Sequence, residues 1–169
     1  ESLCLGHARL AIVDLDGSPQ PIQSREGNVL IANGEIYNFE SLRSSMNDYA
    51  WKTFGDSETI LALYEKSIRS DRKASAKDHG DWIKQLDGMF AFALWDAHNN
   101  QLILARDEMG IKPLVRSIVG SSLLFSSEVK GLRAHPGFEP KLDEQALMAR
   151  LVWEYPLDAT TLFLDVHQV

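Results

Sequence analysis

An uninterrupted apolar segment in the middle of the chain limits the folds open to this sequence. Met89–Trp95 contains only apolar residues, with large and small side chains alternating along most of its length. The polar segment Asp96–Asn100 follows, and Gln101–Ala105 is again mostly apolar. Two apolar runs joined by a short polar turn predict a β-hairpin. The hairpin in turn predicts an antiparallel sheet whose apolar face must be covered by other elements.

Helical periodicity supplies one such element. From Asp56 onward, apolar residues recur on a single helical face, and Glu58 lies in the first turn, where the helix dipole favours a negative charge. Further helices are expected at 39–46, 82–86, 128–134 and 142–152, the last with Asp143 as a candidate cap, and further strands at 3–13, 29–32, 51–54, 114–119 and 123–126. Helices and strands therefore cluster separately, which predicts an α+β fold with an antiparallel sheet.

Composition excludes several classes of protein. The chain has 169 residues, a length typical of one domain, and a formal net charge of -7 without a basic cluster, so no nucleic-acid partner is expected. No apolar run is long enough to cross a bilayer, so no membrane association is expected. Cys4 is the single cysteine. An intramolecular disulfide is therefore impossible, which fits a reducing, cytoplasmic compartment.

Three polar positions interrupt this apolar framework. Arg9 lies within a predicted strand, Asn33-Gly34-Glu35 follows a short apolar strand, and Asp56 begins a helix. Arginine can bind a carboxylate with two donors, carboxylates can accept from an ammonium group, and an Asn amide beside a Gly N–H can stabilise an oxyanion. Spacing alone favours simpler roles, namely a surface ion pair for Arg9, a hairpin turn at Asn33-Gly34 and a helix N-cap at Asp56.

The histidines give no sign of a metal site. Their positions lack the spacing of metal ligands, and no Gly-rich segment precedes a Lys-Ser or Lys-Thr pair in the manner of a phosphate loop. The five are His7, His79, His98, His135 and His167. Structural or surface roles are expected for all of them, and no metal or cofactor is expected in this domain.

Six segments, in order along nearly the whole chain, resemble the glutamine-hydrolysing domain of asparagine synthetases, a branch of the class II glutamine amidotransferases. Each matches a characteristic stretch of that family, and six in the same order are far more specific than any one alone. They are Gly6–Asp14 (GHARLAIVD), Asn33–Asn38 (NGEIYN), Gly55–Ile60 (GDSETI), Asp87–Asp96 (DGMFAFALWD), Ala105–Leu114 (ARDEMGIKPL) and Phe125–Lys130 (FSSEVK).

The resemblance implies a fold and a reaction. The fold is that of the N-terminal nucleophile hydrolases, a four-layer αββα sandwich of mainly antiparallel sheets. The family's nucleophile is an amino-terminal Cys, whose thiolate attacks the side-chain amide of L-glutamine while its own α-amine acts as the base. The products are glutamate and ammonia, and the ammonia passes to a C-terminal synthetase domain for ATP-dependent amidation of aspartate. ATP and Mg²⁺ are expected only in that second domain.

The resemblance also assigns roles by position. Arg9 would bind the substrate α-carboxylate, with Leu10, Ala11, Ile12 and Val13 forming the wall beside it. Asn33 and Gly34 would form the oxyanion hole. Glu35 and Asp56 would bind the α-ammonium group, and the cap role of Asp56 stays open beside this one.

The sequence departs from the family pattern at its start. The family's opening Cys segment is absent, and Cys4 is expected to be a buried strand residue rather than its substitute. Val166–Val169 resembles the family's linker before the synthetase domain. The expectation is therefore a single amidotransferase domain over residues 1–169, truncated at the amino terminus and without glutaminase activity as given.

Other functions stay open. One alternative is a catalytically dead scaffold that binds glutamine or docks a partner domain. Another is an amidotransferase whose ammonia acceptor is not aspartate. The expected partners are L-glutamine and the synthetase domain of the same parent chain, and a homodimer is left open.

Overall fold

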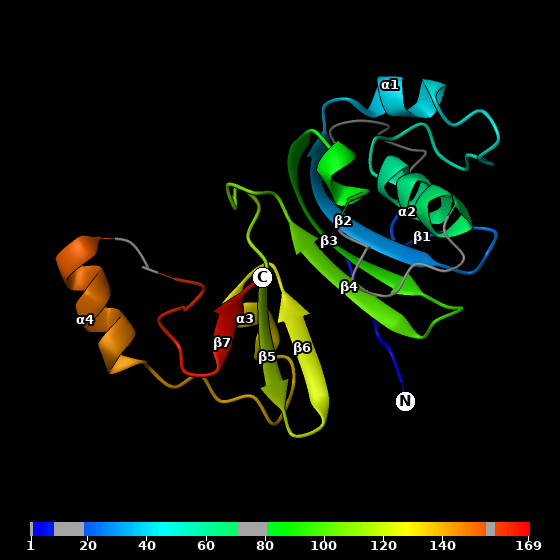
Figure 1. Cartoon of the computed structure of the whole chain (residues 1–169). Helices are drawn as coiled ribbons and strands as arrows, with labels where there is room; N and C mark the ends of the chain where they lie inside the picture. Colours follow the sequence, from blue (N-terminus) through cyan, green and yellow to red (C-terminus); the bar gives the residue numbers. More distant parts are fainter. Residues whose placement is uncertain (1, 9–18, 71–80, 155–157) are drawn as a thin grey trace. The chain divides into compact units, whose positions relative to one another are not determined.

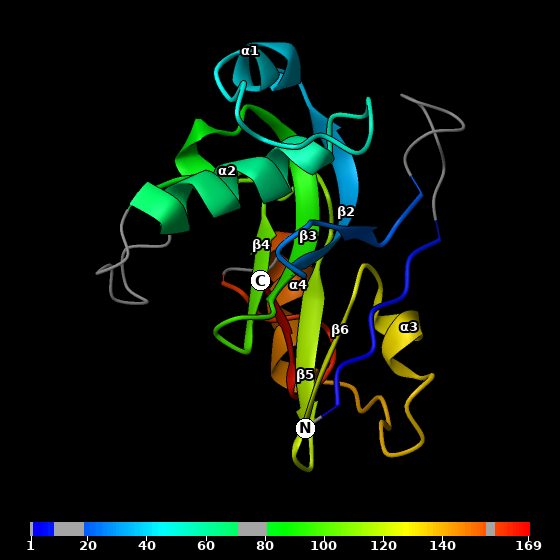
Figure 2. The ribbon, with the colours of Figure 1, turned by 90° about the vertical axis from the view of Figure 1, so that its right-hand side faces the viewer.

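A computed structural model describes residues 2–8, 19–70, 81–154 and 158–169. The chain forms two compact units, residues 1–111 and 112–169, and each is described by itself. Antiparallel sheets and helices occur in both units, so the α+β class is confirmed. In the first unit, α2 lies against one face of a four-stranded sheet, with α1 beside α2 (Figures 1 and 2).

The predicted hairpin forms one side of the first sheet. β3 (Gly88–Asp96) and β4 (Gln101–Arg106) pair antiparallel, and β2 (Val29–Ile36) pairs with the other edge of β3. β1 (Ile22–Gln23) pairs only with Val29 and Leu30 of β2, which gives the strand order β1-β2-β3-β4. Most of one long edge of β2 therefore faces no strand of the described sheet.

The helix after Asp56 packs as its periodicity predicts. α2 (Glu58–Ser70) places Ile60 and Tyr64 in the core, exposed by 1% and 0%, against strand residues such as Phe92. α1 (Phe39–Ser44) and a short 3₁₀ helix, η1 (Ile83–Gln85), add partly buried side chains to the same core. The apolar face of the sheet is thus covered by helices.

A buried polar cluster closes the β3–β4 turn. The carboxylate of Asp96 accepts hydrogen bonds from the Tyr64 hydroxyl, from the main-chain N–H groups of His98 and Asn99, and from the Asn99 side chain. Burial alone would raise the pKa of Asp96, but these hydrogen bonds lower it below its usual value. Burial and the bond to Asp96 both raise the pKa of Tyr64. Asp96 therefore holds the turn as a carboxylate.

A second buried carboxylate explains why residues 51–54 are not the predicted strand. Glu58, which is fully buried, accepts from the N–H groups of Lys52 and Thr53 and from the Thr53 hydroxyl, at 2.7–3.1 Å. These N–H groups bind a side chain instead of a neighbouring strand, so the segment stays irregular. The first turn of α2 is thereby tied to the chain that precedes it.

The second unit is built around a three-stranded antiparallel sheet. β5 (Val115–Val119) lies between β6 (Ser122–Ser126) and β7 (Val166–Gln168), and β7 was not predicted from the sequence. α3 (Val129–Leu132) contributes Leu132 to a small core. α4 (Glu144–Trp153) begins at the predicted cap, since the Asp143 carboxylate accepts from the N–H groups of Gln145 and Ala146.

Two predictions near the amino terminus need correction. Residues 2–8 form no strand, and the remainder of the predicted strand 3–13 lies outside the described residues. Cys4 is exposed rather than buried, since the described segment that contains it, residues 2–8, forms no strand. The predicted turn at Asn33-Gly34 is also wrong, since β2 runs through both residues and stays paired with β3 as far as Ile36.

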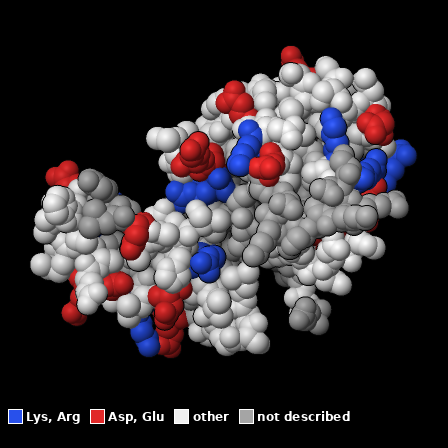
Figure 3. Space-filling model, in the orientation of Figure 1, with Lys and Arg blue, Asp and Glu red and all other residues white. Residues whose placement is uncertain are grey.

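Charged side chains of both signs are found on the surface. Acidic and basic side chains are interspersed on the face drawn in Figure 3.

Over the described part of the chain, none of the helices combines the length and the apolar character needed to span a bilayer. The same residues contain no cluster of three His, Cys, Asp or Glu side chains that could hold a metal ion.

Candidate functional site

Five of the predicted site residues cannot be placed. Arg9, Leu10, Ala11, Ile12 and Val13 all lie outside the described residues. The others, Asn33, Gly34, Glu35 and Asp56, lie in the first unit. These four are the residues to which the family resemblance assigns binding of the oxyanion and of the α-ammonium group.

The structure brings Asp56 to the end of β2. The Asp56 carboxylate oxygen Oδ2 accepts a hydrogen bond of 2.7 Å from the main-chain N–H of Ile36, and Asp56 is only 7% exposed. Its carboxylate thus reaches 20 residues back along the chain. The Asp56 carboxylate therefore lies at the end of β2 that follows the Asn33-Gly34-Glu35 segment.

Side chains bind the unpaired edge of β2 on either side of Gly34. The Gln20 side chain donates to the carbonyl of Ala32 at 2.7 Å and accepts from its N–H at 2.6 Å. Asp56 binds the N–H of Ile36 on the same edge. Alternate residues of a strand direct their N–H and C=O groups to the same edge. The main-chain groups of Gly34 therefore point to this edge, between the Gln20 and Asp56 contacts.

The pairing of β2 with β3 independently indicates the same direction for the Gly34 N–H. Gly34 lies opposite Phe90 in the β2–β3 ladder. The N–H and C=O of Phe90 point away from β2, because both bind Asp107 beyond the end of β4. The pair formed by Gly34 and Phe90 is therefore of the non-hydrogen-bonded kind, and the N–H of Gly34 points away from β3.

Only glycine fits at this point of β2. A Cβ built on Gly34 would lie 2.1 Å from the carbonyl oxygen of Met89 and 2.7 Å from the Cα of Phe90. Its φ of 150° is also one that residues with side chains rarely adopt. Gly88 shows the reciprocal contact, since its Cβ would lie 2.2 Å from the carbonyl oxygen of Glu35. The two strands thus approach each other closely at Gly34, which lies opposite Phe90, and at Gly88, which lies opposite Ile36.

The side chains beside Gly34 lie on the other face of the sheet. Ala32 and Ile36 belong to the helix-covered core, so alternation directs Asn33 and Glu35 to the opposite face. Asn33 is exposed and Glu35 is partly exposed. An amide, a carboxylate and a main-chain N–H are thus presented within three consecutive residues.

The remainder of the NGEIYN segment anchors this end of β2. The Asn38 side chain accepts from the N–H of Asp87 at 3.1 Å and donates to the carbonyl of Gln85 at 2.9 Å. The N–H of Tyr37 donates to the carbonyl of Asp87 at 2.7 Å. The second half of the segment therefore has a structural role, which fixes the first half against the start of β3.

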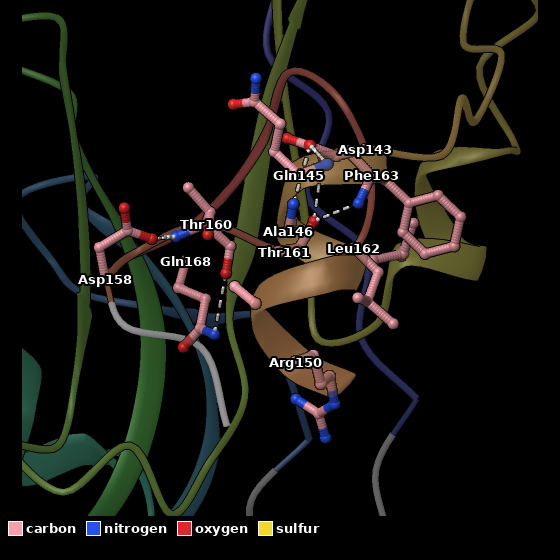
Figure 4. Close-up of a pocket in the computed structure, with 12 residues that line it drawn as sticks. Asp143, Gln145, Ala146, Arg150, Asp158, Thr160, Thr161, Leu162, Phe163 and Gln168 are labelled. Atoms are coloured by element: carbon pink, nitrogen blue, oxygen red, sulfur yellow. Dashed lines mark hydrogen bonds between the residues drawn. The ribbon is translucent and has the colours of Figure 1, made fainter. Parts of the chain in front are cut away.

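A pocket in the second unit is lined by none of the predicted site residues. It has a volume of about 500 Å³ and lies between α4 and the segment leading into β7 (Figure 4). Its walls are held partly by their own hydrogen bonds, including those from Thr160 N–H to Asp158 and from Phe163 N–H to the Thr161 hydroxyl. Its lining combines apolar side chains such as Leu162 and Phe163 with polar ones such as Arg150.

Two residues near the candidate site were not singled out by the sequence analysis. Gln20 falls in none of the predicted helices or strands, and a side chain that replaces a neighbouring strand leaves no periodic signal. Asp107 was noted only within the ARDEMGIKPL segment. An Asp three residues before a Gly is a signal for a side-chain-stabilised turn, and it could have identified Asp107 as structural.

Known proteins resemble this chain over most of its length. The glutamine amidotransferase domain model matches residues 1–169. Asparagine synthetase [glutamine-hydrolyzing] 2 of Bacillus subtilis (strain 168) is 38% identical over 129 residues, which are 76% of this chain and 16% of that protein. Asparagine synthetase [glutamine-hydrolyzing] of Asparagus officinalis is 40% identical over 131 residues, 76% of this chain and 20% of that protein.

A fungal relative carries a different name. Amidase chry2 of Gibberella zeae (strain ATCC MYA-4620 / CBS 123657 / FGSC 9075 / NRRL 31084 / PH-1) is 35% identical over 169 residues, 98% of this chain and 23% of that protein. The chain thus spans less than a quarter of the length of these curated relatives.

Solved structures support the fold. The glutamine phosphoribosylpyrophosphate amidotransferase from B. subtilis, complexed with ADP and GMP, matches with a TM-score of 0.61 and 23% identity over 75% of this chain and 28% of that chain. At this identity the likeness concerns the fold alone, which is that of the N-terminal nucleophile amidotransferases. Together with the family model over residues 1–169, these relatives show that this chain belongs to the glutamine amidotransferase domain family.

Proposed function

We propose that this domain hydrolyses the side-chain amide of L-glutamine to glutamate and ammonia, at the end of β2. The observation that carries the proposal is the direction of the Gly34 main chain. Its N–H points to the open edge of the sheet, between the contacts made by Gln20 and Asp56. A fixed N–H beside an amide side chain is the arrangement that stabilises the oxyanion of acyl transfer.

Charge supports recognition of an amino acid at the same place. Asp56 is buried and bound to Ile36 through one oxygen, and a carboxylate can accept about four hydrogen bonds in all. Glu35 adds a second carboxylate one residue from Gly34. In the proposal both carboxylates bind the α-ammonium group of glutamine, while Arg9 binds the α-carboxylate and Leu10–Val13 form the adjoining wall.

The reaction needs a nucleophile that these residues do not supply. In the proposal it is the amino-terminal Cys of the family, which lies outside the 169 residues. Its thiolate attacks the glutamine amide carbon, the Asn33 side chain and Gly34 N–H stabilise the oxyanion, and its α-amine transfers a proton to the leaving ammonia. Water then releases glutamate from the thioester.

The ammonia is proposed to be used by a synthetase portion of the same longer protein. The relatives named asparagine synthetase extend far beyond the matched segment, which supports this arrangement. Aspartate is the proposed acceptor, and ATP and Mg²⁺ are assigned to the synthetase portion. The role of the present domain is to generate the ammonia.

A different acceptor is the second candidate. The fungal relative named amidase chry2 aligns with 98% of this chain at 35% identity, a longer match than those to the two synthetases described above. The glutaminase chemistry would be the same in both cases. The two candidates differ in the product that receives the glutamine nitrogen.

A docking scaffold without catalysis is the third candidate, and its docking part is supported by α4. None of the residues of α4 is buried, although Met148, Leu151, Val152 and Trp153 are large and apolar and are 54–69% exposed. An apolar helix face of this size is typical of an interaction surface. We propose that the synthetase portion covers it, which is compatible with either an active or an inactive domain.

Nitrogen transfer distinguishes these candidates. The longer protein is incubated with ATP, Mg²⁺, aspartate and glutamine labelled with ¹⁵N in the side-chain amide. We expect ¹⁵N-asparagine by mass spectrometry, together with equimolar glutamate. Glutamate release without labelled asparagine would exclude aspartate as the acceptor and favour the second candidate. Absence of both products would contradict the glutaminase proposal and favour the scaffold.

A further inference from the structure

We infer that Asp107 is a positioning residue for the oxyanion hole, an inference that rests on the proposed glutaminase function. Asp107 follows directly after β4 and is 5% exposed. It is not among the residues that the family resemblance assigns to the substrate. Its connection to the site runs through the main chain of Phe90.

The Asp107 side chain takes the place of a main-chain carbonyl. The β3–β4 ladder ends at the pair formed by Ala91 and Arg106. At the next position the N–H of Asp107 donates to the carbonyl of Phe90 at 2.7 Å, as in a regular ladder. The N–H of Phe90, however, donates to the Asp107 side-chain oxygen Oδ2 at 3.2 Å. One residue therefore binds both main-chain groups of Phe90.

This substitution frees the Asp107 carbonyl to start a turn. That carbonyl accepts from the N–H of Gly110 at 2.9 Å, and the second carboxylate oxygen, Oδ1, accepts from the N–H of Ile111 at 2.7 Å. Gly110 adopts a φ of 64°, in the left-handed region. The carboxylate thus joins the start of β3 to the turn after β4.

The main chain that Asp107 holds is the surface on which Gly34 rests. Gly34 lies opposite Phe90, and the space for a Gly34 Cβ is filled by the Met89 carbonyl and the Phe90 Cα. No side chain separates the two strands at this point, so a shift of Phe90 is passed directly to Gly34. The Gly34 N–H keeps its direction only while Phe90 keeps its position.

Asp96 provides a matched control at the other end of the same strand. It is also a buried carboxylate on the β3–β4 hairpin, and it also accepts main-chain N–H groups, from His98 and Asn99. It lies at the hairpin turn, at the end of β3 remote from Gly34. The Asp96 carboxylate accepts more of the hydrogen bonds named above than the Asp107 carboxylate, so its loss is the harsher change to the hairpin, but only Asp107 is tied to the residue opposite Gly34.

The test compares Asp107→Asn with Asp96→Asn in the longer protein that carries the amino-terminal Cys. An Asn at position 107 can offer one oxygen to two N–H groups, so Phe90 or Ile111 loses its acceptor. We expect kcat for glutamate release to fall about tenfold to a hundredfold with KM changed less than about threefold, the pattern of a misplaced transition-state contact. Asp96→Asn should leave kcat within about threefold, since that turn lies far from Gly34.

Thermal unfolding of both variants accompanies the kinetics, because both are expected to lose stability. Equal losses of kcat in the two variants, or an unchanged kcat in Asp107→Asn, would overturn the inference. If Asp107→Asn does not fold, Asp107→Glu replaces it. Glu keeps the charge but displaces its oxygens, and a kcat equal to that of the unmodified protein would then overturn the inference. Failure of the proposed function is separate, since the unmodified protein would then release no glutamate.

Discussion

Replacing Gly34 by Ala is expected to abolish most of the glutaminase activity of the longer protein. The added Cβ would meet the Met89 carbonyl oxygen at 2.1 Å, and main-chain atoms of a central strand cannot move aside as a flexible side chain can. β2 must therefore shift away from β3, and the Gly34 N–H shifts with it. Loss of one oxyanion donor lowers kcat by about 10²–10³-fold, and we expect a loss of that size.

The control for this substitution is Gly120→Ala in the β5–β6 turn. Gly120 also has a positive φ, 60°, but an added Cβ there meets no atom within 4 Å. Both variants incur a backbone cost, and only Gly34→Ala adds a collision, for which we expect about 3 kcal/mol of lost stability. Glutamate release is measured per folded molecule. A folded Gly34→Ala protein with a kcat within threefold of the unmodified protein would contradict the assignment of Gly34.

Removing the Asp56 carboxylate should also have a large effect. Asp56→Ala is expected to weaken glutamine recognition by about 2–5 kcal/mol, the usual cost of removing one partner of a buried charge pair. The corresponding loss in kcat/KM is about 30-fold to several-thousand-fold. Asp56→Ala also leaves the N–H of Ile36 without this acceptor, so part of the effect could come from the fold.

Asp56→Asn separates recognition from folding. Its amide oxygen can still accept from Ile36, while the negative charge is lost. The substrate is compared with glutaramate, which lacks the α-ammonium group, so the unmodified enzyme should prefer glutamine strongly and Asp56→Asn should lose most of that preference. Asp81→Ala, at an exposed surface ion pair with Lys84, serves as the neutral control. An unchanged preference in Asp56→Asn would show that Asp56 does not bind the ammonium group.

Periodicity predicted the elements that depend on local pattern. The β3–β4 hairpin, the buried face of α2 and the Asp143 cap of α4 all follow from the spacing of apolar and capping residues. Each of these features is fixed by residues close together in the sequence. This is why a single sequence was enough to find them.

The errors arose where a specific contact overrides a local preference. Asn33-Gly34 is a turn signal, yet here Gly34 lets β2 lie against β3, and the need for a glycine comes from Met89 and Phe90. Lys52 and Thr53 lie in the predicted strand 51–54, yet their N–H groups bind the Glu58 carboxylate. Neither contact can be read from periodicity, because the Met89 and Phe90 partners lie far away in the sequence, and the nearby Glu58 acts through a side chain that leaves no periodic signal.

The candidate site also contains residues that the sequence analysis identified and residues that it missed. Resemblance assigned Asn33, Gly34, Glu35 and Asp56, and the structure brings Asp56 to the end of β2. Gln20 and Asp107 were missed because they bind main-chain groups of strands, a role that any accepting or donating side chain could fill. The substrate roles of the four assigned residues, and of Arg9 and Leu10–Val13, stay predictions until the variants are assayed.

Glutamate release by the longer protein tests the central claim most directly. The protein that begins with the amino-terminal Cys is compared with two variants, one with that Cys replaced by Ser and one with Cys4→Ser, the exposed cysteine of the present chain. We predict release from the unmodified protein, a loss of about 10³-fold or more without the amino-terminal Cys, and no loss in Cys4→Ser. Release that survives removal of the amino-terminal Cys, or that disappears with Cys4→Ser, would contradict the account.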